Sequence, residues 1–335
     1  MMSKDPDFPI DFVIPWVDGA DPIWQEKKTK YQGNASTEGN SNQRFEDFGT
    51  LKYLFRSIEK YANWVNKIWL ITDQQVPEWL ANNPQVQVVD HKDYIPAKYL
   101  PTFNSNVIEL NIWRIADLSE HFVLLNDDLL FVSDTKRSDF FSDKGKPKDI
   151  AAQSVFMPRD DFAHIPVNNI SLINQEFSKR QWLKNNWQVA FNYRNGVGLN
   201  ILSIMLSPLP YITRFFEPHV GTAYLKSNFV KVWELFPEKL ELTSQNKFRE
   251  INEVSHWLVR YYQIMTGQIK ARSHSFGRYF NVTQDSELKE FMKRPTSKMI
   301  VLNDDYQDNQ SDNLHVQKSM QLLEVFLSKK SEYER

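Results

Sequence analysis

Short apolar runs alternate with helix-like segments in the first half of the chain, and this alternation limits the fold more than any other feature. The runs span residues 10–14, 67–72, 86–90 and 121–125. Between them, residues 49–62 and 105–118 carry apolar side chains at helical spacing. Strands separated by helices form right-handed crossovers, which build a largely parallel sheet. The sequence therefore predicts an α/β fold.

The second half of the chain has a more helical pattern. Residues 249–265 place apolar side chains on one helical face, and residues 314–327 form another amphipathic segment. Neither an internal repeat nor a clear linker is visible, so we expect one composite domain over residues 1–335. Its expected parts are an α/β part at 10–149, a largely helical part at 150–295, and a strand with a C-terminal helix at 296–335.

Composition excludes several classes of protein. The 335 residues carry 40 Lys and Arg against 42 Asp and Glu, a formal net charge of −2, which argues against a nucleic-acid partner. The absence of cysteine excludes disulfides, thiolate zinc sites and cysteine nucleophiles. No Gly-rich phosphate loop of the Walker or dinucleotide type occurs, which weakens kinase, ATPase and dehydrogenase readings. A Gly-x-Ser-x-Gly elbow is also missing.

The apolar segments do not indicate a membrane span. Residues 1–9 lack the apolar core of a signal peptide. Residues 199–212 form the longest apolar stretch, but Pro208 and Pro210 interrupt it and it is too short to cross a bilayer. We expect a buried helix there, with a lipid-contacting surface as the alternative. The chain is therefore expected to be cytoplasmic, and peripheral attachment to the inner face of the membrane stays open.

Polar residues follow each predicted strand of the first half. Asp18 follows the first strand, Asp73 the second, Asp90 and His91 the third, and Asn126 begins an Asn-Asp-Asp motif after the fourth. In parallel sheets ligands bind beyond the carboxyl ends of the strands. The sequence therefore predicts a binding site at this edge.

Two acidic motifs could hold a metal ion. Asn126-Asp127-Asp128 follows one apolar run, and Asn303-Asp304-Asp305 follows another at residues 299–302. Adjacent carboxylates repel each other unless a cation compensates, and Mg²⁺ or Mn²⁺ prefers oxygen ligands. The alternative is a polar turn in each case. The motifs alone leave both interpretations open, with Asp127, Asp128 and Asp304 as the candidate metal ligands.

Other candidates admit a structural and a functional reading. Asn104, Ser105 and Asn106 begin a predicted helix, where they could cap it or bind phosphate. Arg44 precedes a helix whose Lys52 and Arg56 share one face, and a solvated face is the default reading there. His219 and Arg249 lie in predicted loops, where such residues are usually structural. Histidine can nevertheless accept a proton near neutral pH, and arginine binds phosphate oxygens.

Taken together, these motifs resemble four blocks of the Stealth family. The first block corresponds to residues 11–22, and the second runs from Arg44-Phe45-Glu46-Asp47 to Asn126-Asp127-Asp128. The third resembles the region of Asn195, His219, Phe248-Arg249 and Tyr261-Tyr262, and the fourth is Leu302-Asn303-Asp304-Asp305. The family includes bacterial capsular and exopolysaccharide phosphotransferases and the animal lysosomal-enzyme N-acetylglucosamine-1-phosphotransferase. Gln74 stands where the family often has glycine, and Pro15 where it often has threonine.

The resemblance implies a Rossmann-like or GT-A-like nucleotide-sugar-binding sheet flanked by helices, with the helical C-terminal half completing the site. It also implies a UDP-sugar donor and a divalent cation. By position, the expected catalytic residues are His219, Arg249, Asp127 and Asp304. The expected donor-binding residues are Trp16, Asp18, Arg44, Lys52, Arg56, Asp73, Asn104, Ser105, Asn106, Arg114, Asn126 and Asn303.

The expected reaction moves a hexose 1-phosphate from the UDP-sugar to a hydroxyl of a surface oligosaccharide or polysaccharide, which forms a phosphodiester and releases UMP. Whether that acceptor is linked to a lipid stays open. One alternative is a metal-dependent glycosyltransferase that releases UDP. Another is a non-catalytic carbohydrate-binding partner in a synthase complex.

Overall fold

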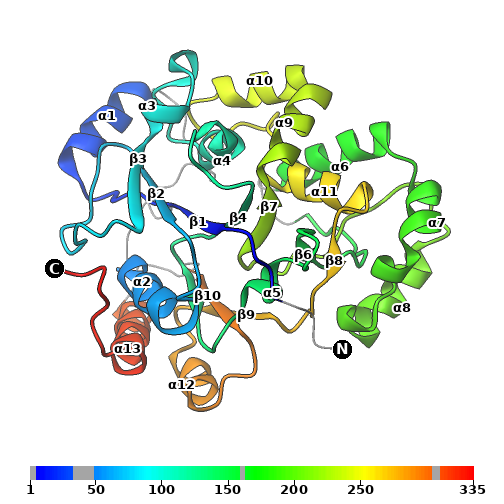
Figure 1. The fold of residues 1–335 in the computed structure, drawn as a ribbon. Helices are drawn as coiled ribbons and strands as arrows, with labels where there is room; N and C mark the ends of the chain where they lie inside the picture. Colours follow the sequence, from blue (N-terminus) through cyan, green and yellow to red (C-terminus); the bar gives the residue numbers. More distant parts are fainter. Residues whose placement is uncertain (1–4, 33–48, 159–162, 304–309) are drawn as a thin grey trace.

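A five-stranded sheet forms the centre of the molecule (Figure 1). The computed structural model describes residues 5–32, 49–158, 163–303 and 310–335. The sheet has the order β3-β2-β1-β4-β7, in which the first four strands run parallel and β7 runs antiparallel to β4. These strands are β1 (Ile10–Pro15), β2 (Ile68–Thr72), β3 (Val86–Asp90), β4 (His121–Leu124) and β7 (Thr222–Leu225). The predicted α/β fold with a largely parallel sheet is confirmed.

A smaller sheet joins distant parts of the sequence. Its order is β5-β10-β9, formed by β5 (Leu129–Phe131), β10 (Met299–Asn303) and β9 (Gly277–Asn281). β10 runs antiparallel to β5, with Val301 opposite Leu129, and parallel to β9. A third, two-stranded sheet pairs β6 (Lys148–Asp149) with β8 (Lys270–Ala271).

Helices cover both faces of the central sheet (Figure 1). Alternate residues of β1 point to opposite sides, so Phe12 packs in one hydrophobic core and Val13 in the other. The first core includes α2 and β10, and the second includes α4, α9 and α11. The helices are α1 (Pro22–Gln32), α2 (Thr50–Tyr61), α3 (His91–Tyr94), α4 (Ser105–Leu110), α5 (Arg137–Phe140), α6 (His164–Glu176), α7 (Lys179–Ala190), α8 (Val197–Leu206), α9 (Lys226–Leu235), α10 (Pro237–Gln245), α11 (Trp257–Met265), α12 (Asp285–Lys293) and α13 (Gln310–Phe326).

Two predicted helices are shorter than expected. The segment 105–118 is α4 followed by a 3-10 turn at Ile112–Arg114. In the segment 249–265, only α11 is helical. The residues before α11 form a turn that is held by buried Glu253. Its carboxylate accepts hydrogen bonds from the Asn106 side chain and from the backbone N–H of Glu250, three positions earlier, both at 2.7 Å. Residues 133–149 contain α5 and the fully buried Phe140.

The expectation of a buried helix at residues 199–212 is wrong. Within α8 only Ser203 is buried, whereas Ile201, Ile204 and Met205 expose 54%, 58% and 71% of their surface. The prediction failed because an apolar run is buried only where another element of the fold covers it, and the sequence pattern does not show that. In the described part of the chain, no helix has the length and apolar character needed to cross a membrane.

An arginine of α2 fastens the C-terminal segment to the fold. Arg56 donates from Nε and Nη2 to the two carboxylate oxygens of Glu334, at 2.8 and 3.0 Å. Its Nη1 donates to the carbonyl of Leu327 at 2.8 Å and to Glu324 at 3.1 Å. Only 5% of the Arg56 surface is exposed, and the two carboxylates raise its pKa above the ordinary value. Arg56 is therefore committed to packing α13 and the chain end against α2.

Candidate active site

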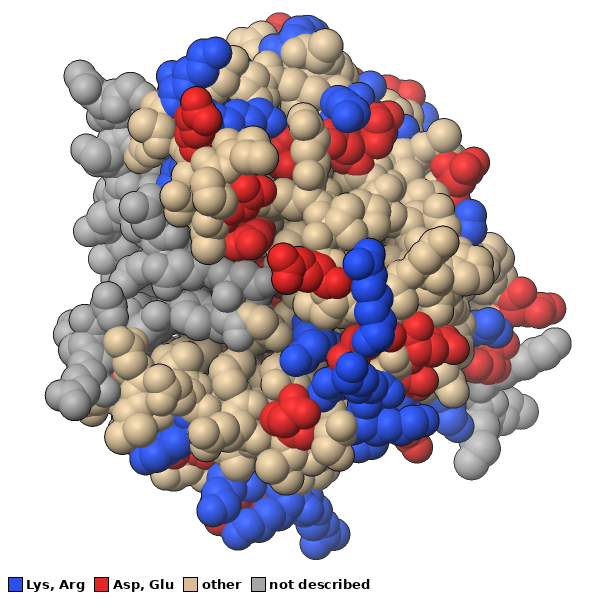
Figure 2. All heavy atoms as spheres, turned by 90° about the vertical axis from the view of Figure 1, so that its left-hand side faces the viewer, with Lys and Arg blue, Asp and Glu red and all other residues tan. Residues whose placement is uncertain are grey.

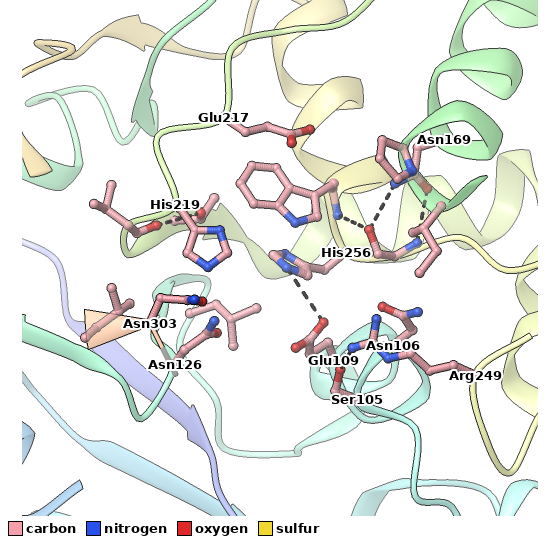
Figure 3. Close-up of a pocket in the computed structure, with 18 residues that line it drawn as sticks. Ser105, Asn106, Glu109, Asn126, Asn169, Glu217, His219, Arg249, His256 and Asn303 are labelled. Atoms are coloured by element: carbon pink, nitrogen blue, oxygen red, sulfur yellow. Dashed lines mark hydrogen bonds and ion pairs between the residues drawn. The ribbon is translucent and has the colours of Figure 1, made fainter. Parts of the chain in front are cut away.

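A cavity of about 530 Å³ opens at the carboxyl end of β4, where the prediction placed a site (Figure 3). Six of the predicted residues line it from five separate segments: Ser105, Asn106, Asn126, His219, Arg249 and Asn303. The sequence did not single out several other lining residues, among them Glu109, Asn169, Glu217, His256 and Trp257.

The pairing of β5 with β10 brings the two acidic motifs toward each other. The Leu302 N–H donates to the Asp128 carbonyl at 3.0 Å, and Asn126 and Asn303 lie close together on one side of the cavity (Figure 3). Asp127 and Asp128 are half-buried in the turn between β4 and β5. Two predicted site residues, Asp304 and Arg44, lie outside the described residues.

The start of α4 contributes a second group of polar side chains. Asn104 caps the helix by accepting from the Asn106 N–H at 3.0 Å, which confirms the capping interpretation. Asn104 is fully buried and donates from its side-chain amide to Glu253 at 2.5 Å, so it positions the helix and does not line the cavity. Ser105 does line it, and its hydroxyl accepts from Arg249 Nη2 at 2.6 Å. Two predicted residues, 144 positions apart, therefore meet at the cavity wall.

His219 lies in the segment that leads into β7. Its backbone φ is +48°, a left-handed conformation that is uncommon for a residue with a side chain. In the close-up its ring lies above Asn126 and Asn303 (Figure 3). Burial lowers the pKa of His219 below its ordinary value of 6.5, against the opposing effect of Glu217. At neutral pH the imidazole is therefore uncharged and can accept a proton.

Glu109 and His256 form a second titratable pair inside the cavity. Burial raises the pKa of Glu109 to about 7, although the nearby Arg249 charge acts in the opposite direction. Burial, reinforced by Arg260, lowers the pKa of His256 to about 3. Its Nε2 lies 3.7 Å from Glu109 Oε2, and its Nδ1 lies 2.7 Å from the Tyr224 hydroxyl.

A sequence signal for Glu109 existed. Glu109 lies four positions after Ser105, so the two side chains share one face of α4. Because Ser105 was already a candidate, Glu109 on the same helical face could have been added to the predicted site. His256 gave no such signal, because it lay inside a segment interpreted as an ordinary amphipathic helix.

A second cavity, of about 560 Å³, lies at the ends of β2 and β3. Asp73 lines it and forms a salt bridge with Lys27 at 2.6 Å. Gln74, also in its wall, has φ of +62°, which explains why a glycine is favoured at that position. The face that includes α1 and β3 mixes basic and acidic side chains (Figure 2). The segment 100–106 runs between the two cavities, with Thr102 in the wall of the second and Ser105 in that of the first.

The structure does not bring the remaining predicted residues to either cavity. Trp16 packs in the first hydrophobic core, and Asp18 exchanges two 2.9 Å hydrogen bonds between its backbone and the Gln75 side chain. Arg114 lies over the rings of Trp113 and Trp233. Lys52 lies over the ring of Tyr53, and Arg56 binds the C-terminal segment. A pattern of cations in a sequence does not reveal partners as distant as Trp233 and Glu334.

The residues near His219 offer oxygen ligands of the kind a hard divalent cation prefers. The side chains of Asn126 and Asn303 supply amide oxygens in the cavity wall, whereas Asp127 and Asp128 lie in the turn that follows Asn126 and are not among the lining residues. Within the described ranges, no three His, Asp or Glu side chains gather into a metal cluster. Asp304, the third expected ligand, follows the last described residue of β10.

Two regions of the chain match models of a known family, and the whole chain resembles solved glycosyltransferases. The models for Stealth conserved region 1 and Stealth conserved region 2 match residues 8–36 and 44–149. Among solved structures, the galactosyltransferase LgtC with donor and acceptor sugar analogues aligns with a TM-score of 0.41 and 8% identity, over 93% of this chain and 95% of its own. The glycosyltransferase GlyE of Streptococcus pneumoniae aligns with a TM-score of 0.40 and 11% identity, over 96% of this chain and 63% of its own.

Relatives in sequence cover nearly the whole chain. The exopolysaccharide phosphotransferase cps2G of Lactiplantibacillus plantarum is 43% identical over 340 residues, which span 100% of this chain and 98% of the relative. The capsular polysaccharide phosphotransferase WcwK of Streptococcus pneumoniae is 41% identical, over 88% and 89%. The receptor polysaccharide phosphotransferase WefC of Streptococcus gordonii is 40% identical, over 82% and 83%. With two matching region models and full-length relatives of this identity, the chain belongs to the Stealth family.

Proposed function

We propose that the chain transfers a sugar 1-phosphate from a UDP-sugar to a hydroxyl of a surface polysaccharide, releasing UMP. The observation that carries the proposal is the meeting of His219, Arg249 and Asn126 at one cavity, with Asp127 and Asp128 in the turn that follows Asn126. A proton acceptor and a phosphate-binding cation, next to a turn that carries two carboxylates, are parts that phosphoryl transfer requires. The relatives cps2G and WcwK are named as polysaccharide phosphotransferases, which supports the same reaction class.

In the proposed step, the acceptor hydroxyl attacks the β-phosphorus of the donor, the one that carries the sugar. A new phosphorus–oxygen bond forms, and the bond between that phosphorus and the bridging oxygen of the pyrophosphate breaks. UMP leaves with the electron pair and the bridging oxygen. His219 takes the proton of the attacking hydroxyl, since burial keeps its imidazole uncharged at neutral pH.

Arg249 is the proposed partner of the transferred phosphoryl group. Its guanidinium is held at the cavity wall by Ser105, at 2.6 Å, so its donors are positioned before substrate arrives. A divalent cation held by Asp127, Asp128 and Asp304 would neutralise the charge of the leaving phosphate. The side chains of Asn126 and Asn303 are proposed to orient that end of the donor.

We place the nucleotide end of the donor in the second cavity. Lys27, Lys30 and Lys92 line it together with the ring of Tyr31, against which a base can stack. Because Thr102 and Ser105 lie in the walls of the two cavities, a donor that spans both would pass along this short segment. Asp73 then acts on the donor through Lys27, which it holds at 2.6 Å.

Variants of His219 and Arg249 test the proposal. We expect His219→Ala to lower kcat by about 100-fold or more, because general-base catalysis contributes at least that much. Arg249→Met should lower kcat/KM by a similar factor, because the phosphoryl group loses a charged partner. Turnover is measured as release of UMP from a UDP-sugar with an oligosaccharide acceptor.

The matched control is Arg294→Met, an exposed arginine at the end of α12, which should keep full activity. Full activity in the His219 or Arg249 variant, with an unchanged melting temperature, would exclude its assigned role. Release of UDP in place of UMP would identify a glycosyltransferase. No turnover of any UDP-sugar would favour a non-catalytic carbohydrate-binding partner.

Glu109 generates a prediction about pH. Its pKa is about 7 in the folded protein against an ordinary value of 4.5, so folding stabilises the protonated form. The contribution of Glu109 to the free energy of unfolding is therefore fully present below pH 4.5 and is lost as pH rises through 7. The shift corresponds to about 3 kcal/mol of unfolding free energy. Glu109→Gln cannot ionise, so the variant should gain stability relative to the parent protein by up to that amount between pH 4.5 and 8.

Urea unfolding at several pH values measures this difference. Exposed Glu287→Gln on α12 serves as the control and should follow the pH dependence of the parent protein. A stability difference between Glu109→Gln and the parent that does not change with pH would show that the Glu109 carboxyl is not held in a site that disfavours its charge.

We also propose that α8 attaches the protein to the inner face of the membrane, where a lipid-linked acceptor would be available. The helix exposes Ile201, Ile204 and Met205, and Trp187 on α7 is 59% exposed. Exposed Arg180 and Lys184 on α7 suit the anionic head groups around such a helix. Figure 1 places α7 and α8 at one edge of the molecule.

Sedimentation with anionic lipid vesicles tests this attachment. We expect the parent protein to sediment with vesicles that contain an anionic phospholipid, and Ile204→Glu to lose most of that binding. Val325→Glu on α13 replaces a residue that is 77% exposed and should have no effect. Equal sedimentation of all three proteins, or of none, would contradict a membrane role for α8.

A further inference from the structure

A third cavity, of about 620 Å³, lies at the opposite end of the β5-β10-β9 sheet from the candidate active site. Lys298, which precedes β10, lines this third cavity, and Asn303, which ends β10, lines the active site. Five residues of extended chain separate the two positions by roughly 16 Å. The third cavity shares no lining residue with the other two.

Positive charge dominates its lining. Lys148, Arg194, Arg272 and Lys298 face a single lining carboxylate, Asp139. That carboxylate already accepts the Lys136 N–H at 2.9 Å as part of the α5 cap. A second carboxylate that favours the charge of Arg272, Asp149, is held by Arg260 through two hydrogen bonds of 2.7 and 3.0 Å.

Arg272 has a buried charge that lacks a close counter-ion among the described residues. Only 3% of its surface is exposed, and its Nη1 donates to the Gly221 carbonyl at 3.0 Å. Its Nε is buried without a hydrogen-bond partner in the described part of the chain. Burial lowers the pKa of Arg272 to about 10, which reflects the free-energy cost of that charge. An anion in the cavity would offset this cost.

Lys148 is only partly compensated. Burial, followed by the nearby charge of Arg194, lowers the pKa of Lys148, against the smaller opposing effects of Asp139, Asp143 and Asp5. Lys298 donates to the Asp134 carbonyl, which occupies one of its three donors. The cations therefore raise one another's free energy, and an anion between them would lower it.

Hydroxyl groups complete the lining. They belong to Ser133, Ser138, Ser273, Ser275, Thr296 and Ser297. Each hydroxyl can both donate and accept, which suits the hydroxyls of a sugar as well as phosphate oxygens. The volume falls in the range of small-molecule sites and exceeds what an inorganic ion would fill.

We propose that this cavity is a second binding site, for a phosphorylated sugar, distinct from the site of the reaction. Lys148, Arg272 and Lys298 bind the phosphate, and the surrounding hydroxyls bind the sugar. The choice of a sugar rests on the proposed function of the chain, whereas the charge argument for a phosphate does not. The phosphate can belong to a free sugar 1-phosphate or to a phosphodiester within a polysaccharide.

Calorimetric titration tests the proposal without requiring turnover. An Arg249→Met background removes the phosphate partner of the active site, and hexose 1-phosphate, a methyl hexose phosphodiester, inorganic phosphate and the neutral hexose are titrated in turn. We expect at least one of the first two ligands to bind. The one that binds more tightly shows whether the phosphate belongs to a free sugar 1-phosphate or to a phosphodiester. Adding Lys148→Gln or Lys298→Gln should weaken that binding about tenfold each. Lys144→Gln, an exposed lysine outside the cavity, should leave it unchanged.

Several results would overturn the site. Absence of binding to either sugar phosphate would do so, as would equal affinity in the Lys148 and Lys298 variants when circular dichroism shows that they are folded. Affinity for inorganic phosphate equal to that for the sugar phosphates would overturn the assignment to a sugar. If the cavity binds sugar phosphate but the parent protein releases no UMP, the proposed function fails and the binding site stands.

Discussion

The antiparallel pairing of β5 with β10 is the contact on which the candidate active site depends. It joins residues 129–131 to residues 299–301, and it places Asn303 beside the turn that holds Asp127. The contact closes a long loop, which has an entropic cost. Fully buried Leu130 and Ile300, packed in the same core as β1 and α2, provide the compensating free energy.

Buried polar contacts then fix the candidate catalytic side chains with respect to this sheet. Glu253 binds the side chains of Asn104 and Asn106, so the turn that carries Arg249 is tied to the start of α4. Arg249 reaches Ser105 on the same helix. On the other side, Arg272 holds the Gly221 carbonyl, two residues after His219. The proposed sugar-phosphate cavity and the candidate active site therefore lie on either side of one short segment.

The sequence predicted the strands of the molecule better than it predicted the partners of the charged side chains. Buried parallel strands are apolar along their whole length, so β1 and β2 were visible as runs, and the polar residues after them marked the edge of the sheet at which the first two cavities lie. Asn126, Ser105, His219 and Arg249 reached the cavity as expected, the last two from the family resemblance. Arg56 and Arg114 did not, because their partners are distant in the sequence or aromatic. The exposure of α8 was also invisible, since an apolar pattern does not say what covers it.

The fate of one oxygen atom tests the central claim most directly. A UDP-sugar donor is prepared with ¹⁸O in the bridge between the sugar C1 and the β-phosphorus, and the products are analysed by mass spectrometry and phosphorus NMR. Transfer of the sugar with its phosphate leaves that bridge intact, so the label should appear in the phosphodiester product and not in the released nucleotide. Label recovered in UDP would mean that the bond between C1 and oxygen had broken, which would contradict transfer of the sugar together with its phosphate.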